Sequence, residues 1–399
     1  MMRIRLGISL GLLPSLVVAH SNIHDAMQGD AQVGAAASLS YYSEGSAASD
    51  GTWRIAGNLM GGHALPVEKG AGLADAILWG RYKLAPEWQI HAKLAMHDEG
   101  DSSRSLSVDN LLLSRTHLLN QPVDLELGLM DAAFSPSASS HPSLSRFAER
   151  PFMADAFWGG SIHDTGLRLT WKPLEKLSFV TELWSGDFFP ATKGDYAQSL
   201  LVQTQQQWGQ WSLKAGVWGL HSSANERPDD RYSAGHSHSS NTTTFPDVRF
   251  TGDTDLADAW LALDLPKWKQ WSPSLHYEYA QSDSEGTLIN RDQARQAQYH
   301  SAHKAILLTP SLSVGKHELS YRYERLSLNN ELEGAGAGLL ATDANLLNTH
   351  RPQRQTLQWK WDWHKNIATR VAYTKDQVLT PETERWMVDL VWQQKLYDR

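Results

Sequence analysis

Apolar and polar residues alternate along most of this chain. The segment "LQWKWDW" (357–363) places Trp359, Trp361 and Trp363 on alternate positions, with Lys360 and Asp362 between them. Because successive side chains of a β-strand point to opposite faces, this segment predicts a strand with one apolar face and one charged face. The same period of two recurs in "WQIHAKLAM" (88–96), "VDLELGL" (123–129), "GLRLTWK" (166–172), "LHYEY" (275–279), "ELSYRYE" (318–324) and "WMVDLVWQ" (386–393).

Sixteen segments follow this pattern, and helical periodicity is hard to find. The predicted strands span 32–42, 71–84, 87–98, 105–117, 123–134, 163–173, 177–186, 196–209, 211–224, 254–267, 272–283, 298–314, 316–328, 354–365, 366–378 and 384–396. Many are roughly 10 to 13 residues long, above the mode of about 5–6 in soluble proteins and close to the ~9–11 that a tilted membrane strand needs.

The connections between these strands alternate in length. Those after even-numbered strands are short: 85–87, 118–122, 173–176, 209–210, 267–271, 315–316 and 364–366. Those after odd-numbered strands are mostly long and polar: 43–70, 135–162, 225–253, 284–297 and 329–353, with shorter ones at 99–104, 187–195 and 379–383. Short periplasmic turns and long extracellular loops are typical of outer-membrane barrels. An even number of strands places both termini on the periplasmic side.

Two architectures fit alternating strands, and they differ in which face is wet. In a soluble sandwich the apolar face is the core, whereas in a membrane barrel it meets lipid and the polar face lines the interior. Sixteen long strands would make a very large sandwich core, and Trp and Tyr lie near strand ends, as aromatic girdles do. We therefore expect an all-β fold, a closed antiparallel transmembrane β-barrel of about sixteen strands, since lipid tolerates no open sheet edge.

The first 19 residues have the pattern of a cleaved signal peptide. Arg3 and Arg5 precede an apolar run from Leu6 to Val18, and small residues end the segment at Ala19. The alternative is a membrane anchor, but a run of about 13 apolar residues is short of the ~20 that a spanning helix needs. We expect residues 20–399 to form a single barrel domain in the outer membrane of a Gram-negative bacterium.

Composition narrows the class of protein further. The 399 residues include no cysteine, which excludes disulfide scaffolds and thiolate metal sites. A formal charge of −8 argues against a nucleic-acid partner, because proteins that bind nucleic acid are usually basic. Outer-membrane lipid and a small hydrophilic solute or ion are the expected partners, and a homo-oligomer is left open.

A barrel of sixteen strands usually leaves an aqueous channel. The predicted inward faces carry charges of both signs, so the wall alone fixes no preference for anions or cations. These residues are Asp75, Arg81, Lys83, Lys93, Glu126, Arg168, Lys214, Glu278, Arg322, Glu324, Lys360, Asp362 and Arg370.

One segment is more specific, "RFAERPFMADAFWGGSIHDTGLRLTW" (146–171). It is similar to the third-loop segment of porin-like barrels distantly related to the phosphate-selective porin O/P group. The resemblance rests on Phe147, Glu149, Arg150, Pro151, Phe157, Gly159, Asp164 and Gly166. It implies a channel and leaves the solute open. The chain has no run of lysines suited to phosphate, so phosphate selectivity does not follow.

In sixteen-stranded porins the third loop commonly folds into the lumen, and the resemblance carries this expectation to residues 135–162. The candidate residues of the constriction and lumen are Arg146, Glu149, Arg150, Asp155, His163, Asp164, Arg168, Lys93, Arg322, Lys360 and Arg370. Rings of charge at close quarters set selectivity. In the alternative interpretation the loop aromatics merely pack the loop and its charges are solvated.

The fifth connection on the long-loop side (about 225–253) suggests a metal site. It holds His236 and His238 with Asp229 and Asp230 upstream, and imidazole and carboxylate ligands suit zinc, nickel or copper. No resident cofactor is expected, only transient Zn²⁺ at this loop. The alternative is a polar loop that happens to contain histidines.

No local spacing in the chain is diagnostic of an enzyme, and no Gly-rich phosphate loop leads from a strand into a helix. The few residues between His20 and the first strand leave no room for the plug of an energy-coupled transporter. The sequence therefore predicts a passive, non-enzymatic outer-membrane channel for small hydrophilic solutes, with a link to divalent metal uptake as a finer hypothesis. The alternative is a surface adhesin or receptor with a plugged barrel.

Overall fold

The structure is a computed structural model that describes residues 30–46, 53–62, 64–98, 104–138, 141–192, 195–229, 245–347 and 350–398. The predicted signal peptide, residues 1–19, lies outside the described residues. So do His236, His238 and Asp230 of the predicted metal loop.

The described chain forms one antiparallel sheet. Its strands are β1 (Ala31–Tyr42), β2 (Gly70–Ala85), β3 (Trp88–Asp98), β4 (Arg104–Arg115), β5 (Val123–Asp131), β6 (His163–Leu174), β7 (Leu177–Trp184), β8 (Ala197–Trp208), β9 (Trp211–Arg227), β10 (Val248–Asp264), β11 (Trp271–Asn290), β12 (Arg295–Val314), β13 (His317–Ser327), β14 (Asn330–Glu333), β15 (Gln353–His364), β16 (Ile367–Gln377) and β17 (Thr383–Asp398). Two α-helices, α1 (Phe152–Trp158) and α2 (Ala337–Asp343), lie in long connections.

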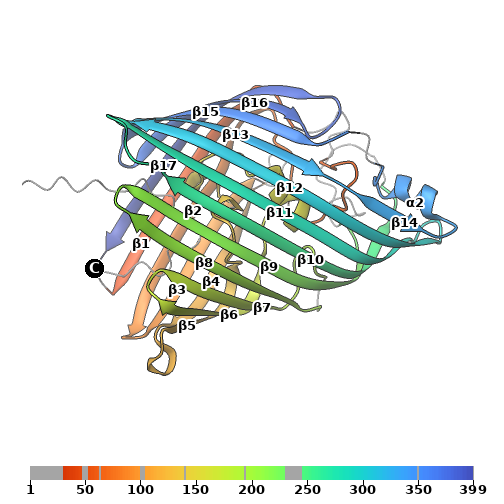
Figure 1. Cartoon of the computed structure of the whole chain (residues 1–399), viewed down its shortest axis with the longest axis horizontal. Coiled ribbons are helices and arrows are strands. Elements are labelled where there is room, and N and C mark those ends of the chain that lie inside the picture. Colours follow the sequence, from red (N-terminus) through yellow and green to blue (C-terminus); the bar gives the residue numbers. More distant parts are fainter. Residues whose placement is uncertain are drawn as a thin grey trace, which may run out of the picture.

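The sheet closes on itself (Figure 1). Strand β1 pairs with β2 on one side and with β17 on the other, so the first and last strands complete the ring. Strand β14 pairs only with β12 and extends the wall at one end, which leaves sixteen strands in the barrel itself. The predicted fold class is confirmed.

The two faces of the wall have opposite character, as the alternation predicts. On β15 the outward Leu357 is 48% exposed, whereas its neighbour Gln358 is 1% exposed. The same contrast separates outward Leu127 from inward Glu126 on β5 and outward Trp386 from inward Arg385 on β17. Large apolar side chains are exposed around the ring while charged ones are buried within it, and this arrangement suits a barrel surrounded by lipid.

Strand boundaries agree closely with the predicted ones, except on the long side of β10–β13. The polar segment 284–297 was expected to be a loop, but β11 and β12 continue through it and leave only a short turn at 291–294. That expectation was wrong because the few apolar residues of this segment, Leu288, Ile289, Ala294 and Ala297, do not alternate with polar ones. No helix in the described ranges is long and apolar enough to cross a membrane.

The interior is more apolar than the sequence suggested. A cluster of buried side chains joins α1 to Trp53, Ile55 and Met60 of the first long connection and to inward residues of the wall. The wall residues of this cluster include Leu112, Met130, Val180, Trp184, Leu201, Trp218, Leu220, Leu256, Ala280, Ala305, Leu307 and Leu326. Part of the wall, from β4 round to β13, therefore packs against the loops, and the charges gather mainly elsewhere.

Candidate functional site: the inward loop and the arginine wall

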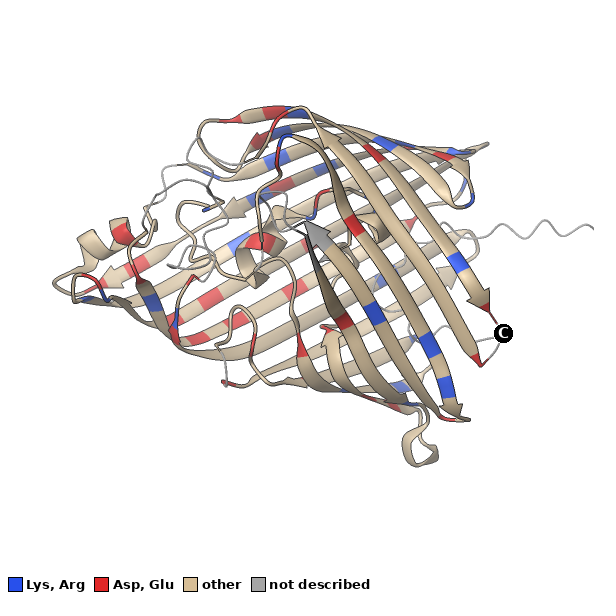
Figure 2. Cartoon of the chain, turned by 180° about the vertical axis from the view of Figure 1, so that it is seen from behind, with Lys and Arg blue, Asp and Glu red and all other residues tan. Residues whose placement is uncertain are grey.

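Residues 141–162, called here the inward loop, run inside the barrel, where Figure 2 shows α1 enclosed by strands. Helix α1 starts directly after Pro151, whose missing N–H is no loss at a helix start. It ends at Gly159, which has φ 64°, the left-handed conformation that glycine adopts most readily. All seven side chains of α1 are buried. The part of the 135–162 connection that forms α1 is thus fully buried.

The start of the inward loop is fixed to the wall by a buried carboxylate. Asp75 of β2 accepts hydrogen bonds from the Ser143 backbone N–H (3.1 Å) and from the Ser143 hydroxyl (2.7 Å). His141 lies between Asp75 (3.6 Å) and Asp109 of β4 (3.1 Å). All four side chains are buried, so solvent competes little for these contacts.

Four arginines on β13, β15, β16 and β17 form what we call the arginine wall: Arg322, Arg354, Arg370 and Arg385. Arg370 pairs with Asp389 at 2.6 Å and donates to the carbonyls of Ser145 (2.8 Å) and Pro142 (3.1 Å). One guanidinium therefore holds a wall carboxylate and two loop carbonyls together.

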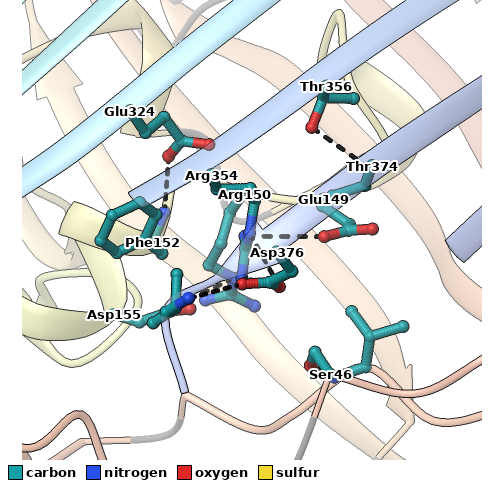
Figure 3. Close-up of polar contacts among 12 residues, drawn as sticks. Ser46, Glu149, Arg150, Phe152, Asp155, Glu324, Arg354, Thr356, Thr374 and Asp376 are labelled. Carbon is teal, nitrogen blue, oxygen red and sulfur yellow. Dashed lines mark hydrogen bonds and ion pairs between the residues drawn. The ribbon is translucent and has the colours of Figure 1, made fainter. Parts of the chain in front are cut away.

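Glu149 makes the main ionic contact between the inward loop and the wall. Its carboxylate accepts from Arg385 at 2.9 Å and 2.5 Å. It also lies 3.5 Å from Arg354 (Figure 3). Both arginines also pair with Asp376, at 2.9 Å and 3.0 Å. Burial by itself would raise the pKa of Glu149, but attraction to Arg385, its hydrogen bonds and attraction to Arg354 and Arg322 outweigh it and lower the pKa to about 2.

Arg322 and Glu324 of β13 complete this contact. Arg322 donates to the Glu149 carbonyl at 2.8 Å and stacks over the Phe147 ring at 4.5 Å. Glu324 accepts from the Phe152 backbone N–H at 2.8 Å, at the first residue of α1 (Figure 3). A carboxylate at a helix N-terminus meets N–H groups that have no partner within the helix.

The opposite side of α1 is held by packing and by a second loop. Trp158 packs edge-on against Phe134 at 5.1 Å, and Asn58 donates to the Ala156 carbonyl at 2.8 Å. Gly62 and Gly159 meet backbone to backbone, so that a Cβ on Gly62 would lie 2.5 Å from the Gly159 carbonyl oxygen. Only glycine permits this approach, and the two loops form one packed unit.

The predicted site residues do not form one cluster. Arg146 and Glu149 contact the wall, Arg146 through Glu318 at 3.2 Å, while Arg150 lies 3.7 Å from Asp155 within the loop. The Asp164 carboxylate accepts from Ser185 and the backbone N–H groups of 186 and 187, so it shapes a strand end.

The remaining predicted residues line the wall away from the arginines. Arg168 pairs with Glu182 (2.6 Å) and Glu126 (2.9 Å), and Lys93 pairs with Asp131 (2.9 Å). Lys360 pairs with Asp362 at 2.9 Å, between Gln358 and the short-turn end of β15. Arg322 and Arg370 belong to the arginine wall, so the structure brings together only part of the predicted set.

Sequence reasoning missed Arg354, Arg385, Asp376 and Asp389. Each is a charged residue at a polar position of its alternating strand, and each is buried on the inward side. The alternation therefore indicated that they face the interior. What the sequence lacked was their partner, since Glu149 and Arg385 are 236 positions apart.

The metal prediction is not tested by the fold. Among the described residues no group of three or more His, Asp or Glu side chains is placed to hold a metal ion. Of the predicted ligands only Asp229 falls within the described ranges.

Comparison with known proteins gives the fold and no closer relationship. No protein-family model matches the chain, and no curated protein matches it. A solved loop-deletion mutant of OmpT, an outer membrane protein of Vibrio cholerae, is 12% identical with a TM-score of 0.54, covering 92% of this chain and 98% of that one. OprB of Pseudomonas putida is 10% identical with a TM-score of 0.53, covering 92% and 94%. OmpF of Salmonella typhi is 10% identical with a TM-score of 0.50, covering 91% and 97%.

These likenesses show the fold alone, a closed β-barrel like those of these bacterial outer-membrane proteins. They do not single out the phosphate-selective group.

Proposed function

We propose that the protein is an outer-membrane channel for the passive diffusion of small hydrophilic solutes or ions, and that the inward loop gates it. The observation that carries this proposal is the inverted barrel, with lipid-compatible side chains outside and paired charges of both signs inside. In a solid core, apolar side chains would often stabilise as well as buried ion pairs or better, so paired charges of both signs favour an interior that water or solute can enter. The proposed function is non-catalytic.

The inward loop determines how such a channel would open. Every strand of the barrel contributes a buried inward side chain, and α1 is buried on all sides. This burial supports a role for the inward loop in narrowing the channel. The inward loop is held to the arginine wall by ion pairs and hydrogen bonds. These contacts can be exchanged for contacts with solute or water, so the loop can move aside.

The same burial favours a second candidate, a surface-binding protein whose barrel is permanently plugged. In that case the long extracellular loops would hold the ligand, and the arginine wall would only stabilise the plug.

Conductance in planar bilayers separates the two candidates. The experiment compares the full chain with a variant in which residues 141–158 are replaced by a flexible linker. The variant is the positive control, because without the loop a sixteen-stranded barrel leaves an aqueous channel. We expect brief openings from the full chain and steady conductance from the variant. A full chain that stays silent while the variant conducts would favour the surface-binding protein.

The link to divalent metal stays a separate prediction. Zinc titration of the full chain against a His236→Ala/His238→Ala variant checks it. We expect binding in the full chain alone, and identical isotherms would remove the metal from the proposed function.

A further inference from the structure

The outer wall of the barrel has an apolar groove of about 430 Å³ near the short-turn end of β11, β12, β13 and β15. These strands lie side by side, with β11, β12 and β13 adjacent in Figure 1. Its outward lining includes Leu275, Pro310, Leu312, Leu319, Tyr321 and Leu357. The groove faces the lipid side of the wall, so it is distinct from the inward loop.

Two prolines shape the groove. Pro310 has no N–H to donate, and the pairing of β12 with β13 is interrupted, without a change of register, between the pairs Leu308–Tyr323 and Ser311–Ser320. Pro273 of β11 lies opposite Leu312. A proline ring folds back on its own backbone and projects less than the surrounding leucine and tyrosine side chains, which leaves a depression between them.

The turns next to the groove are basic. The connections 265–270, 315–316 and 365–366 carry Lys267, Lys269, Lys316 and Lys365 and no acidic residue. The other four short turns, 86–87, 118–122, 175–176 and 209–210, carry one lysine, Lys176, against two glutamates, Glu87 and Glu175. Of the five lysines in the seven short turns, four therefore lie in the sector that contains the groove.

These lysines are exposed, and within the described ranges none of the four forms an ion pair with a carboxylate. Lys269 lies over the Trp268 ring at 5.3 Å, and Lys316 donates to the Trp363 carbonyl at 3.0 Å. Beside them His317, Trp359, Trp361 and Trp363 form a continuous stack, with ring centroids 4.2–6.2 Å apart. Tryptophan favours the level of the lipid headgroups, so lysines and groove meet at the membrane interface.

We propose that this sector binds an anionic phospholipid of the periplasmic leaflet, with one acyl chain in the groove and the phosphate at the turn lysines. The charge pattern selects this occupant, because a zwitterionic lipid would gain little from four unpaired ammonium groups. An apolar groove beside a basic, aromatic rim complements both ends of such a lipid. The site goes beyond the proposed channel and does not depend on it.

Native mass spectrometry of the purified barrel tests the site. Palmitoyl-oleoyl phosphatidylglycerol and the matching phosphatidylethanolamine are added in parallel, and retained lipid is counted. The variant is Lys267→Gln/Lys269→Gln/Lys316→Gln. The matched control, Lys69→Gln/Lys176→Gln/Lys375→Gln, removes the same charge from exposed lysines elsewhere. We expect the full chain and the control to retain phosphatidylglycerol preferentially, and the variant to bind it roughly fivefold more weakly for each lysine removed.

A second variant, Pro310→Leu, fills the groove and keeps the lysines, and it too is expected to retain less lipid. Equal retention of the two lipids by the full chain, or equal phosphatidylglycerol binding by variant and control, would overturn the proposal. The proposal would also be overturned if the full chain forms a lipid-free oligomer and the Leu319→Arg variant is a monomer. A second copy of the chain would then cover the groove. If the proposed channel function is wrong, the full chain will show no conductance but will still retain the lipid.

Discussion

At the scale of single residues, Glu149 joins the inward loop to three arginines of the wall. Its carboxylate accepts from Arg385 and lies near Arg354, while its carbonyl accepts from Arg322. Removing a buried charge that neutralises several others leaves those others uncompensated, which is costly. The loop is therefore held by a small number of ionic contacts that one substitution can weaken.

The substitution Glu149→Gln should release the inward loop. A glutamine keeps the size of the side chain but gives Arg385 and Arg354 no charge to pair with. We expect more frequent or longer openings in planar bilayers at pH 7. The matched control is Glu44→Gln, an exposed partner of Lys69 in another loop. Identical conductance in both variants would mean that Glu149 does not hold the gate.

The pH dependence of the full chain follows from the same group. The pKa of Glu149 lies at about 2, below its ordinary value of 4.5, so its stabilising contribution is fully present above pH 4.5. That contribution, on the order of 3 kcal/mol, is lost as the pH falls from about 4.5 towards 2. Conductance of the full chain should therefore rise only in this acidic range, and the Glu149→Gln variant should not show the rise.

At the scale of elements, the alternation within each strand decides which substitutions the barrel tolerates. On β15, Leu357 faces outward and Lys360 faces inward near the short-turn end. Leu357→Arg should lower the free energy of unfolding, by about 2–4 kcal/mol at the bilayer midplane and by less towards the interface. Lys360→Glu should leave stability nearly unchanged and shift ion selectivity towards cations. Urea unfolding in lipid and reversal potentials measure the two effects, and equal destabilisation would contradict the assignment of faces.

The inward loop and the first long connection meet at Gly159 and Gly62, and one added carbon atom would disturb this contact. In Gly62→Ala the new Cβ would lie 2.5 Å from the Gly159 carbonyl oxygen, so the loops must separate. We expect increased conductance with an intact barrel. Gly209→Ala is the control, because Gly209 also has a positive φ (60°) but has open space where the Cβ would be. Backbone strain is thus matched, and a similar effect in both variants would exclude the loop contact as the cause.

At the scale of the whole molecule, the barrel and its contents are separable. The ring is closed by continuous ladders between neighbouring strands, including β1 with β17, and these hydrogen bonds do not depend on the inward loop. The interior is held by the apolar cluster around α1 and by the arginine wall.

Replacing residues 141–158 by a linker should therefore leave the strand content unchanged in circular dichroism. The same variant should unfold at a lower temperature, since it loses the buried surface of α1. Loss of the sheet itself in this variant would mean that the loop is needed to form the barrel.

Alternation of apolar and polar residues, strand lengths and the alternation of short turns with long loops determined the fold from the sequence alone. Lipid outside and water inside impose this period of two on every membrane strand, so local sequence carries the information. The tertiary structure alone decided which charges meet. Glu149 joins Arg385 and Arg354 only because closure of the barrel brings β15 and β17 to the place where the third loop folds inward. The apolar part of the interior was likewise hidden, because inward leucines and tryptophans look in sequence like any other apolar strand positions. Contacts between distant segments depend on ring closure and loop packing, and neither leaves a local pattern in the chain.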